Sequence, residues 1–298
     1  MKKFIAILMT LLMVLSFAAC AETTEDPTDA SVDASADASS DASADASVDA
    51  SADTSDETET VKFTVGFDAE FPPFGFIADD GSYDGFDLAV AKEVCARLNW
   101  EFVAQPIDWA SKDAELANGT IDCIWNGFTK NGREDLYTWT DAYYDNSIVM
   151  VVKADSGIKT LADLAGKNVI TQAASSALDA LNSEDNADLL ASFGELIESA
   201  DYNNAFMELD MGTADAIAVD YGVALYNLAS KDEGAFVILD ETVSSEQYAI
   251  GFKLGNTELA EKVWEQVEDI AADGTMAKIA ADYVEKGLRV DSLVLIEE

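Results

Sequence analysis

The sequence predicts an α/β protein with two sheets covered by helices. Strand-like and helix-like segments alternate along residues 61–298, which favours largely parallel sheets covered on both faces. This stretch is long enough for two such sheets. Apolar residues make up 49% of the chain, so a sizeable core can form. Ligands of such sheets bind beyond the carboxyl ends of the strands, where candidate site residues are expected.

The first elements after residue 60 have a clear apolar period. Apolar side chains at every second position predict a strand over residues 62–67, and a spacing of four predicts a helix over residues 84–99. The helical positions are Phe86, Val90, Val94 and Leu98. The next predicted elements are a strand over 101–105, a helix over 111–118, a strand over 120–125 and a β-branched strand over 147–153.

The second half of this stretch continues the alternation. A short helix over residues 161–165 ends at the capping Gly166. The following predicted elements are strand 168–171, helix 175–181, strand 196–199, helix 203–211, strand 214–220, helix 221–229 and strands 235–239 and 247–253. Residues 257–283 read as helical, with a break near Asp273 and Gly274.

The charge of the chain excludes several classes of function. Lys and Arg total 17 and Asp and Glu total 58, for a net charge of −41. Phosphate contacts need a cationic surface, so we expect neither a nucleic-acid partner nor charge-driven docking on anionic lipid. Because the chain has no His, it has no His general base, triad or metal ligand. No metal site and no cofactor are predicted.

Residues 1–20 have the pattern of a secretory signal peptide. Lys2 and Lys3 precede a short apolar run, and small residues follow before Cys20. The Ala-Ala-Cys end resembles the lipobox of bacterial lipoproteins, although Phe17 stands where Leu is usual. The resemblance implies that Cys20 is lipidated and fixes the exported protein to the membrane. The alternative is an ordinary secretory signal that happens to end near a Cys.

Residues 21–60 are expected to form a disordered acidic linker rich in Asp, Ala and Ser. Thirteen acidic residues occur there without Lys, Arg or an aromatic side chain, and Asp recurs every fourth position from Asp29 to Asp53. Like charges at that spacing repel in a helix, and self-repulsion extends the chain. A calcium-binding repeat is the alternative, but the segment lacks the Gly turns that surround such an ion.

Five sequence motifs follow in order. They are GFDAEFPPFGF at 66–76 with GFDL at 85–88, GTIDCIWNGFT at 119–129 leading to Arg133, YTWTDAYY at 137–144, LADLAGK at 161–167 and EQYAI at 246–250. Over residues 62–290 the chain resembles the bacterial extracellular solute-binding proteins of polar amino-acid ABC transporters (family 3), in lipoprotein form. The resemblance implies a two-lobed periplasmic-binding-protein-like fold (type II), with the ligand in the cleft between lobes.

In that fold one lobe consists of two separate segments of the chain, and the other lobe is inserted between them. Residues 61–150 plus 247–298 would form lobe 1, and residues 151–246 would form lobe 2. Two crossover strands would join them. The family pattern also assigns roles to single residues of this chain.

A free amino acid carries a carboxylate and an ammonium, so a closed cleft must supply a buried cation and a buried anion. The resemblance implies that Arg133 binds the carboxylate with its forked guanidinium. Thr129 and the backbone at Asn126 and Gly127 would add donors. The family commonly has one more residue between Thr129 and Arg133. The alternative for Arg133 is an exposed ion pair with Glu134.

The remaining site predictions also come from the resemblance. Asp220, at a strand end, would bind the ammonium, with a helix-capping role as the alternative. Asp68 would meet the ligand side chain or its ammonium. Further residues would line the cleft as aromatic walls or as a turn that donates a backbone N–H and a hydroxyl to the carboxylate. Phe71 and Trp109 would form the aromatic walls, with packing in the core as the alternative. Ala174 and Ser175 would form the turn.

Two cysteines remain besides Cys20. Cys95 lies on the first predicted helix and Cys123 on a strand that this helix could cover. In an exported protein such a pair favours a disulfide, and two buried free thiols are the alternative.

The leading functional hypothesis is a binding protein without enzymatic activity. It would bind a free, polar amino acid outside the cytoplasmic membrane as a monomer, and deliver it to the permease subunits of an ABC importer. Asp68 and Glu70 favour a polar or cationic ligand without identifying it. The alternatives are an amino-acid-sensing receptor component and a cyclohexadienyl-type dehydratase on the same fold. The absence of His and of metal-ligand spacing disfavours the enzyme.

Overall fold

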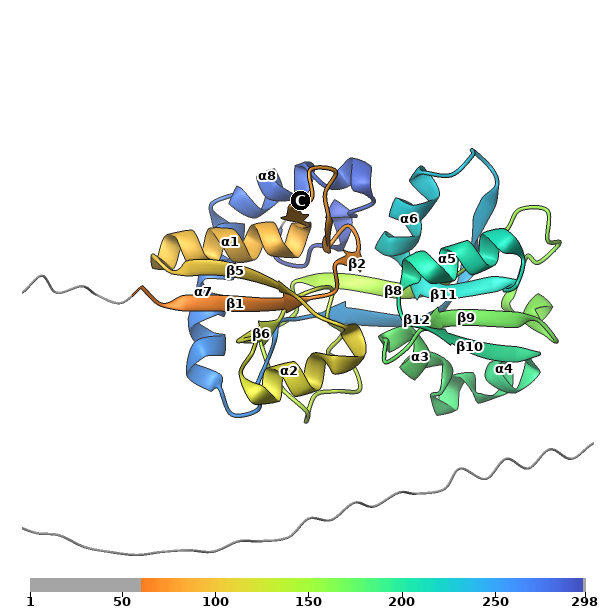
Figure 1. Cartoon of the computed structure of the whole chain (residues 1–298), viewed down its shortest axis with the longest axis horizontal. Helices are drawn as coiled ribbons and strands as arrows, with labels where there is room; N and C mark the ends of the chain where they lie inside the picture. The colour runs from red at the N-terminus through yellow and green to blue at the C-terminus, as the bar shows by residue number, and fades with distance from the viewer. Residues whose placement is uncertain (1–59, 297–298) are drawn as a thin grey trace, which may run out of the picture. The chain divides into compact units, whose positions relative to one another are not determined.

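The computed structural model describes residues 60–296 (Figure 1). The predicted signal peptide with Cys20, and all but the last residue of the predicted linker, lie outside this range. None of the helices in residues 60–296 combines the length and the apolar character that crossing a bilayer requires.

The first sheet contains five strands, in the order β5-β1-β6-β13-β7. Their bounds are β1 Lys62–Phe67, β5 Glu101–Pro106, β6 Cys123–Ile124, β7 Thr138–Trp139 and β13 Gly251–Phe252. β1 runs parallel to β5 and β6, whereas β13 is antiparallel to β6 and β7. The helices around this sheet are α1 Phe86–Leu98, α2 Lys112–Asn118, α7 Thr257–Ala272 and α8 Thr275–Ala281.

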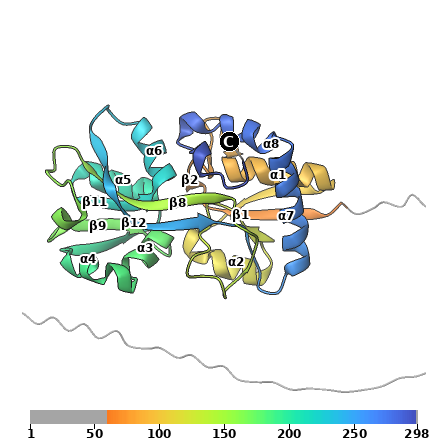
Figure 2. The same cartoon turned by 180° about the vertical axis from the view of Figure 1, so that it is seen from behind.

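The second sheet also contains five strands, in the order β10-β9-β11-β8-β12. Their bounds are β8 Tyr144–Lys153, β9 Asn168–Gln172, β10 Glu195–Ser199, β11 Ala216–Asp220 and β12 Phe236–Tyr248. The helices α5 Tyr202–Met211 and α6 Tyr221–Ala229 lie on one side of this sheet, and α3 Ser176–Leu181 and α4 Ala187–Ser192 on the other (Figures 1 and 2). We call the elements around the first sheet lobe 1 and those around the second sheet lobe 2.

Shorter elements complete the described chain. A small sheet consists of β2 Glu70–Phe71, β3 Gly75–Ile77 and β4 Tyr83–Asp84. The 3₁₀ helices are Trp109–Ser111, Leu161–Leu164, Glu184–Asn186, Val284–Lys286 and Val290–Ser292. The small sheet follows β1 directly, so it lies at the carboxyl end of that strand.

Most predicted elements are confirmed within a few residues. Residues 257–283 divide into α7 and α8, and between them Gly274 adopts a left-handed backbone with φ of 78°. The prediction of largely parallel sheets holds for only part of each sheet, because β7, β8, β12 and β13 pair antiparallel. The strand predicted over 120–125 is shorter, because Thr120 to Asp122 form the turn before β6.

The separate strands predicted over residues 235–239 and 247–253 are wrong. β12 is one strand from Phe236 to Tyr248, with irregular register around Thr242, and β13 contains only two residues. The polar segment between the two predicted strands lacks an apolar period, yet it pairs with the β-branched strand β8. Pairing with β8 therefore stabilises this segment as a strand, although its own sequence does not predict one.

β8 and β12 are the strands that connect the two lobes (Figure 1). They are paired antiparallel from Phe236 with Lys153 to Tyr248 with Tyr144. β12 then leads into β13 of the first sheet, and β8 begins shortly after β7 of that sheet. The predicted lobe boundaries at 150/151 and 246/247 fall within or beside these two strands and stay predictions.

An aromatic cluster packs where β8 and β12 leave lobe 1. The Phe74 ring meets the Tyr144 and Tyr248 rings edge-on, with centroids 5.3 and 5.1 Å apart. Tyr144 and Tyr248 stack on each other at 5.6 Å, and all three side chains are buried. Because the rings interdigitate closely, the cluster fixes how the connecting strands leave the first sheet.

Cys95 and Cys123 are buried free thiols in this structure, so it contains the second of the two alternatives and no disulfide between them. Cys95 lies on α1 and Cys123 on β6. Burial raises the pKa of the Cys95 thiol to about 12 and that of Cys123 well above its ordinary value. The protonated thiols therefore behave as small core side chains.

We predict that Phe74→Ala lowers the free energy of unfolding by roughly 3–5 kcal/mol, the usual cost of truncating a buried aromatic ring. The reason is the loss of its contacts with Tyr144 and Tyr248. Urea denaturation of the purified protein measures the change. Met211→Ala, at a side chain that is 69% exposed on α5, is the control and should change little. Equal effects of the two substitutions would contradict the role given to this cluster.

Candidate ligand-binding site

A small cavity lies between the two lobes. Lobe 1 contributes Phe71, Trp109, Gly127, Thr129 and Arg133, and lobe 2 contributes Gln172, Ser175, Ser176 and Asp220. Seven of these nine were predicted from the sequence. Gln172, Ser175 and Asp220 lie at or just after the carboxyl ends of β9 and β11, as expected for ligand sites of parallel strands.

Arg133 is the buried cation of the cavity. Its side chain is 9% exposed, and Nη2 donates to Asp179 Oδ2 of α3 at 2.7 Å. The guanidinium lies 5.4 Å from the centroid of the Phe128 ring. The alternative of an exposed ion pair with Glu134 is wrong, because the side chain is buried and its ion pair crosses to lobe 2.

Asp220 is the buried anion of the cavity, 2% exposed at the end of β11. Its Oδ1 accepts hydrogen bonds from Asn146 Nδ2 at 2.8 Å and from the Tyr248 hydroxyl at 2.5 Å. Burial, and then the neighbouring Glu246 carboxylate, raise the pKa of Asp220 well above its ordinary value. Although Asp220 precedes α6, its side chain makes no capping hydrogen bond, so the capping alternative is wrong.

Asp68 and Asn126 do not line this cavity but support it. Asp68 Oδ2 accepts from Gln172 Nε2 at 2.6 Å, a contact between the lobes. Asn126 Oδ1 in turn accepts from the Asp68 backbone N–H at 2.9 Å. Burial raises the pKa of Asp68 above its ordinary value. Asn126 therefore positions Asp68, and Asp68 contacts a residue of the cavity wall.

Gly127 fits the cavity wall because it has no side chain. Its backbone is left-handed, with φ of 54°, and an added Cβ would lie 2.8 Å from the Phe71 ring and 3.0 Å from that of Tyr248. Its N–H donates to the buried Asp87 Oδ2 at 2.6 Å, so it is not available to a ligand. In this structure Gly127 therefore lines the cavity while its N–H is used by Asp87, and its predicted role toward a ligand stays a prediction.

Two hydroxyl groups that were predicted to donate to a ligand donate to other groups of the protein instead. The Ser175 hydroxyl donates to the Gln172 carbonyl at 2.7 Å and accepts from the Leu178 N–H as the cap of α3. The Thr129 hydroxyl donates to Glu246 Oε1 at 2.9 Å. Each hydroxyl has one hydrogen, so neither can donate to a ligand carboxylate in this arrangement.

The turn at Ala174 is held by a lysine that sequence reasoning missed. Ala174 has a left-handed φ of 56°, and its carbonyl accepts from Lys112 Nζ at 3.1 Å across the lobes. Burial, and then the nearby Arg133, lower the pKa of Lys112 to about 8. The Ala174 carbonyl thus takes part in a contact between the lobes, but Ala174 does not line the cavity.

Gln172, Ser176, Glu246 and Asn146 were also missed as site residues. Gln172 follows the predicted strand 168–171 directly, so the strand-end rule could have found it. Glu246 begins the EQYAI motif, but its role depends on contacts with Thr129 and Asn146 that are distant in the sequence. No sequence signal indicated those contacts.

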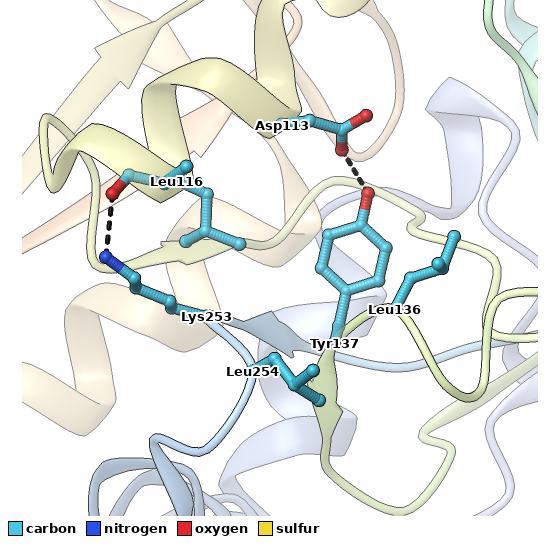
Figure 3. Close-up of a pocket in the computed structure, with 7 residues that line it drawn as sticks. Asp113, Leu116, Leu136, Tyr137, Lys253 and Leu254 are labelled. Atoms are coloured by element: carbon cyan, nitrogen blue, oxygen red, sulfur yellow. Dashed lines mark hydrogen bonds between the residues drawn. The ribbon is translucent and has the colours of Figure 1, made fainter.

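A larger hollow lies elsewhere on lobe 1 (Figure 3). It is lined by Asp113, Leu116, Ala117, Leu136, Tyr137, Lys253 and Leu254. The Tyr137 hydroxyl donates to Asp113, and Lys253 Nζ donates to the Ala117 carbonyl at 2.7 Å. Since its polar groups pair with one another and lobe 2 contributes nothing, we place the candidate site in the smaller interlobe cavity.

The cavity between the lobes therefore combines a buried cation with a buried anion and aromatic walls. Such a site is complementary to a small ligand that carries both charges. Within residues 60–296 no group of three or more Cys, Asp or Glu side chains is arranged to hold a metal ion. The residues that line the cavity can bind a ligand by ion pairs and hydrogen bonds.

Comparison with known proteins agrees with this geometry. Residues 63–286 match the family of bacterial extracellular solute-binding proteins, family 3. The chain belongs to this family. The predicted family and the two-lobed α/β fold are thereby confirmed.

Individual relatives of this family-3 protein bind different amino acids. The L-cystine-binding protein TcyJ of Escherichia coli K12 is 26% identical over 74% of this chain and 81% of its own. The ABC transporter arginine-binding protein 1 of the same organism is 28% identical over 73% and 88%. A Streptococcus pneumoniae ABC uptake transporter substrate-binding protein with bound histidine is 32% identical over 77% and 94%, with a TM-score of 0.72.

The buried Asp87 supports the cavity wall and should make stability depend on pH. Its Oδ2 accepts from the Gly127 N–H and from the Tyr143 hydroxyl, each at 2.6 Å. Burial raises the pKa of Asp87 to about 7. Because the folded protein holds this proton more tightly than the unfolded chain does, its contribution is full below the ordinary Asp pKa and is lost as pH rises through about 7.

We predict that Asp87→Asn removes this part of the pH dependence. Between pH 5 and pH 8 the wild-type free energy of unfolding should fall relative to that of the variant. Urea denaturation of both proteins at several pH values measures the difference. Parallel curves over this range would show that Asp87 does not titrate as its burial indicates.

Proposed function

We propose that this protein binds a free, polar amino acid outside the cytoplasmic membrane and delivers it to the permease of an ABC importer. The main observation behind this proposal is that buried Arg133 and buried Asp220 line one cavity from opposite lobes. The family and the amino-acid-binding relatives support this proposal. Those relatives are transport proteins, and we propose no enzymatic activity.

Arg133 would bind the ligand carboxylate. Its guanidinium has five N–H donors, and two can grip the two oxygens of a carboxylate. Asp179, its partner in the structure, is 63% exposed, whereas Arg133 is 9% exposed. Asp179 can therefore turn toward water at little cost while Arg133 stays desolvated. The ligand carboxylate would take over or share this ion pair.

Asp220 would bind the ammonium group. Its acceptor oxygens lie at the end of β11, and the Thr129 and Ser176 oxygens line the same cavity. Phe71 and Trp109 would cover the ligand from lobe 1. An ammonium needs several acceptors when it leaves water, and this end of the cavity provides them.

Contacts across the cleft favour the closed form. Gln172 donates to Asp68, and Lys112 donates to the Ala174 carbonyl. A ligand that adds contacts to both lobes shifts the open–closed equilibrium further toward closure. The permease would then receive the closed, loaded protein.

Acidic side chains at one side of the cavity favour a polar or cationic ligand side chain. Asp68 is buried behind the cavity wall against Gln172, and Glu70 lies beside Asp201 of lobe 2. Burial, and then Asp201, raise the pKa of Glu70 to about 7. A cationic or donor-rich ligand group would relieve this accumulation of negative charge.

The proposal includes export and attachment through lipid on Cys20, with the folded part on the outer face of the cytoplasmic membrane. The family is extracellular, which supports export. The signal pattern before Cys20 supports the attachment, and the acidic residues 21–60 would act as a spacer. We propose that the protein acts as a monomer.

We predict that calorimetric titration with the twenty amino acids, cystine and ornithine finds at least one ligand, and that Arg133→Ala weakens its binding by at least about 30-fold. Truncating one partner of a buried charge pair costs about 2–5 kcal/mol. Arg97→Ala is the matched control, because Arg97 pairs with Glu93 and Asp273 away from the cavity. Unchanged affinity of Arg133→Ala would show that the carboxylate binds elsewhere.

We predict that the full-length protein incorporates palmitate in a bacterial host and fractionates with membranes, and that Cys20→Ser abolishes both. The reason is that the acyl chains supply the membrane affinity. Metabolic labelling and fractionation measure the two effects, and Cys95→Ser is the control for a buried cysteine. An unlabelled wild-type protein would contradict the lipid attachment and leave the binding proposal intact.

A further inference from the structure

A second buried acid lies directly behind the cavity wall. Glu246 is 6% exposed near the end of β12. Its Oε1 accepts from Asn146 Nδ2 at 2.8 Å, from the Thr129 hydroxyl at 2.9 Å and from the Ser176 hydroxyl at 3.2 Å. Neither the family resemblance nor the sequence analysis gave this carboxylate a role.

Glu246 determines how two cavity hydroxyls can act. Thr129 and Ser176 both line the cavity, and each donates its one hydroxyl hydrogen to Glu246. Only their oxygen lone pairs remain for a ligand. Together with the Asp220 carboxylate, this part of the cavity offers acceptors, which suits an ammonium with three N–H donors and does not suit a carboxylate.

Glu246 and Asp220 also act on each other. Asn146 Nδ2 donates to Glu246 Oε1 and to Asp220 Oδ1, each at 2.8 Å, so both acids lie next to one amide nitrogen. Two carboxylates this close and this buried oppose each other's ionisation. Burial raises the pKa of both, and the Glu246 charge raises that of Asp220 further.

The other titratable and charged groups around the pair do not neutralise it. Tyr248 donates to Asp220, and Tyr202 lies near it; burial raises the pKa of both phenols well above their ordinary values, so they stay neutral. Arg133 lines the same cavity but is paired with Asp179 of α3. Lys112 donates to the Ala174 and Trp109 carbonyls.

We propose that Glu246 and Asp220 form a two-carboxylate ammonium site, in which the ammonium of the ligand displaces a proton that the pair retains. This inference rests on the proposed function. The arriving ammonium keeps its three protons and supplies the positive charge that allows both acids to ionise. The displaced proton passes to the solvent. Binding therefore strengthens as pH rises, until the free pair has lost its proton or the ammonium begins to lose its own.

Proton release on binding can be counted directly. Wild-type protein is titrated by calorimetry with L-arginine, L-glutamine, L-histidine and L-cystine between pH 5.5 and pH 8, in phosphate and in Tris. The difference in heat between the buffers gives the protons released, after those of the free ligand are subtracted. We expect up to one proton released per bound ligand at the acid end, and fewer as pH rises.

Variants separate this role from a merely structural one. Glu246→Gln should weaken binding roughly 10- to 100-fold, the range carried by hydrogen bonds to charged groups, and should abolish proton release and the pH slope. Glu246→Asp, which keeps the charge, should retain release. Glu241→Gln is the matched control, since Glu241 lies exposed on the same strand and accepts from the Leu161 N–H. Circular dichroism checks that each variant folds.

The outcomes distinguish the two proposals. Wild-type binding without proton release, or a Glu246→Gln variant that releases protons as wild type does, would overturn the two-carboxylate site and leave the proposed function intact. No binding of any of the four amino acids by wild type would contradict the proposed function itself. If Glu246→Gln does not fold, Thr129→Val tests the same acceptor surface, with weaker binding and unchanged proton release expected.

Discussion

The burial of opposite charges in one interlobe cavity is the constraint on which the rest of this structure depends. Arg133 and Asp220 are each almost completely removed from water. An isolated charge in such a place is costly, so each needs partners. The protein gives Arg133 the exposed Asp179 and gives Asp220 only neutral donors, Asn146 and Tyr248. The charge of Arg133 is therefore balanced by an opposite charge, whereas the charge of Asp220 is stabilised only by hydrogen bonds.

This asymmetry explains how closure and binding are connected. The contacts that cross the cleft join buried side chains of lobe 1, such as Lys112 and Asp68, to groups of lobe 2. The strands β8 and β12 carry the connection between lobes, and the cluster of Phe74, Tyr144 and Tyr248 fixes where they leave lobe 1. A ligand with both charges can contact Arg133 and Asp220 at the same time only when the lobes are closed.

The sequence predicted the elements with a strong local period and the residues at strand ends. The helix α1 and the strand β1 follow from apolar spacing, whereas Asp220 was predicted from the resemblance to the family, which its place at the end of an apolar strand matches. What the sequence could not predict depends on distant partners. β12 is continuous because β8 pairs with it, and Glu246 belongs to the site because Thr129 and Asn146 reach it from other elements. In this structure the hydrogens of Thr129, Ser175 and Gly127 are donated to other protein groups, and for Thr129 and Gly127 these acceptors, Glu246 and Asp87, are distant in the sequence.

The most direct test of the account is a crystal structure of residues 60–298 with the amino acid that binds most tightly. The ligand carboxylate should lie within hydrogen-bond distance of the Arg133 guanidinium, at about 2.7–2.9 Å, and the ammonium at a similar distance from Asp220. Asp179 would have moved away from Arg133 or would share it with the ligand. A ligand bound outside this cavity, or bound with its carboxylate on the Asp220 side, would contradict the account.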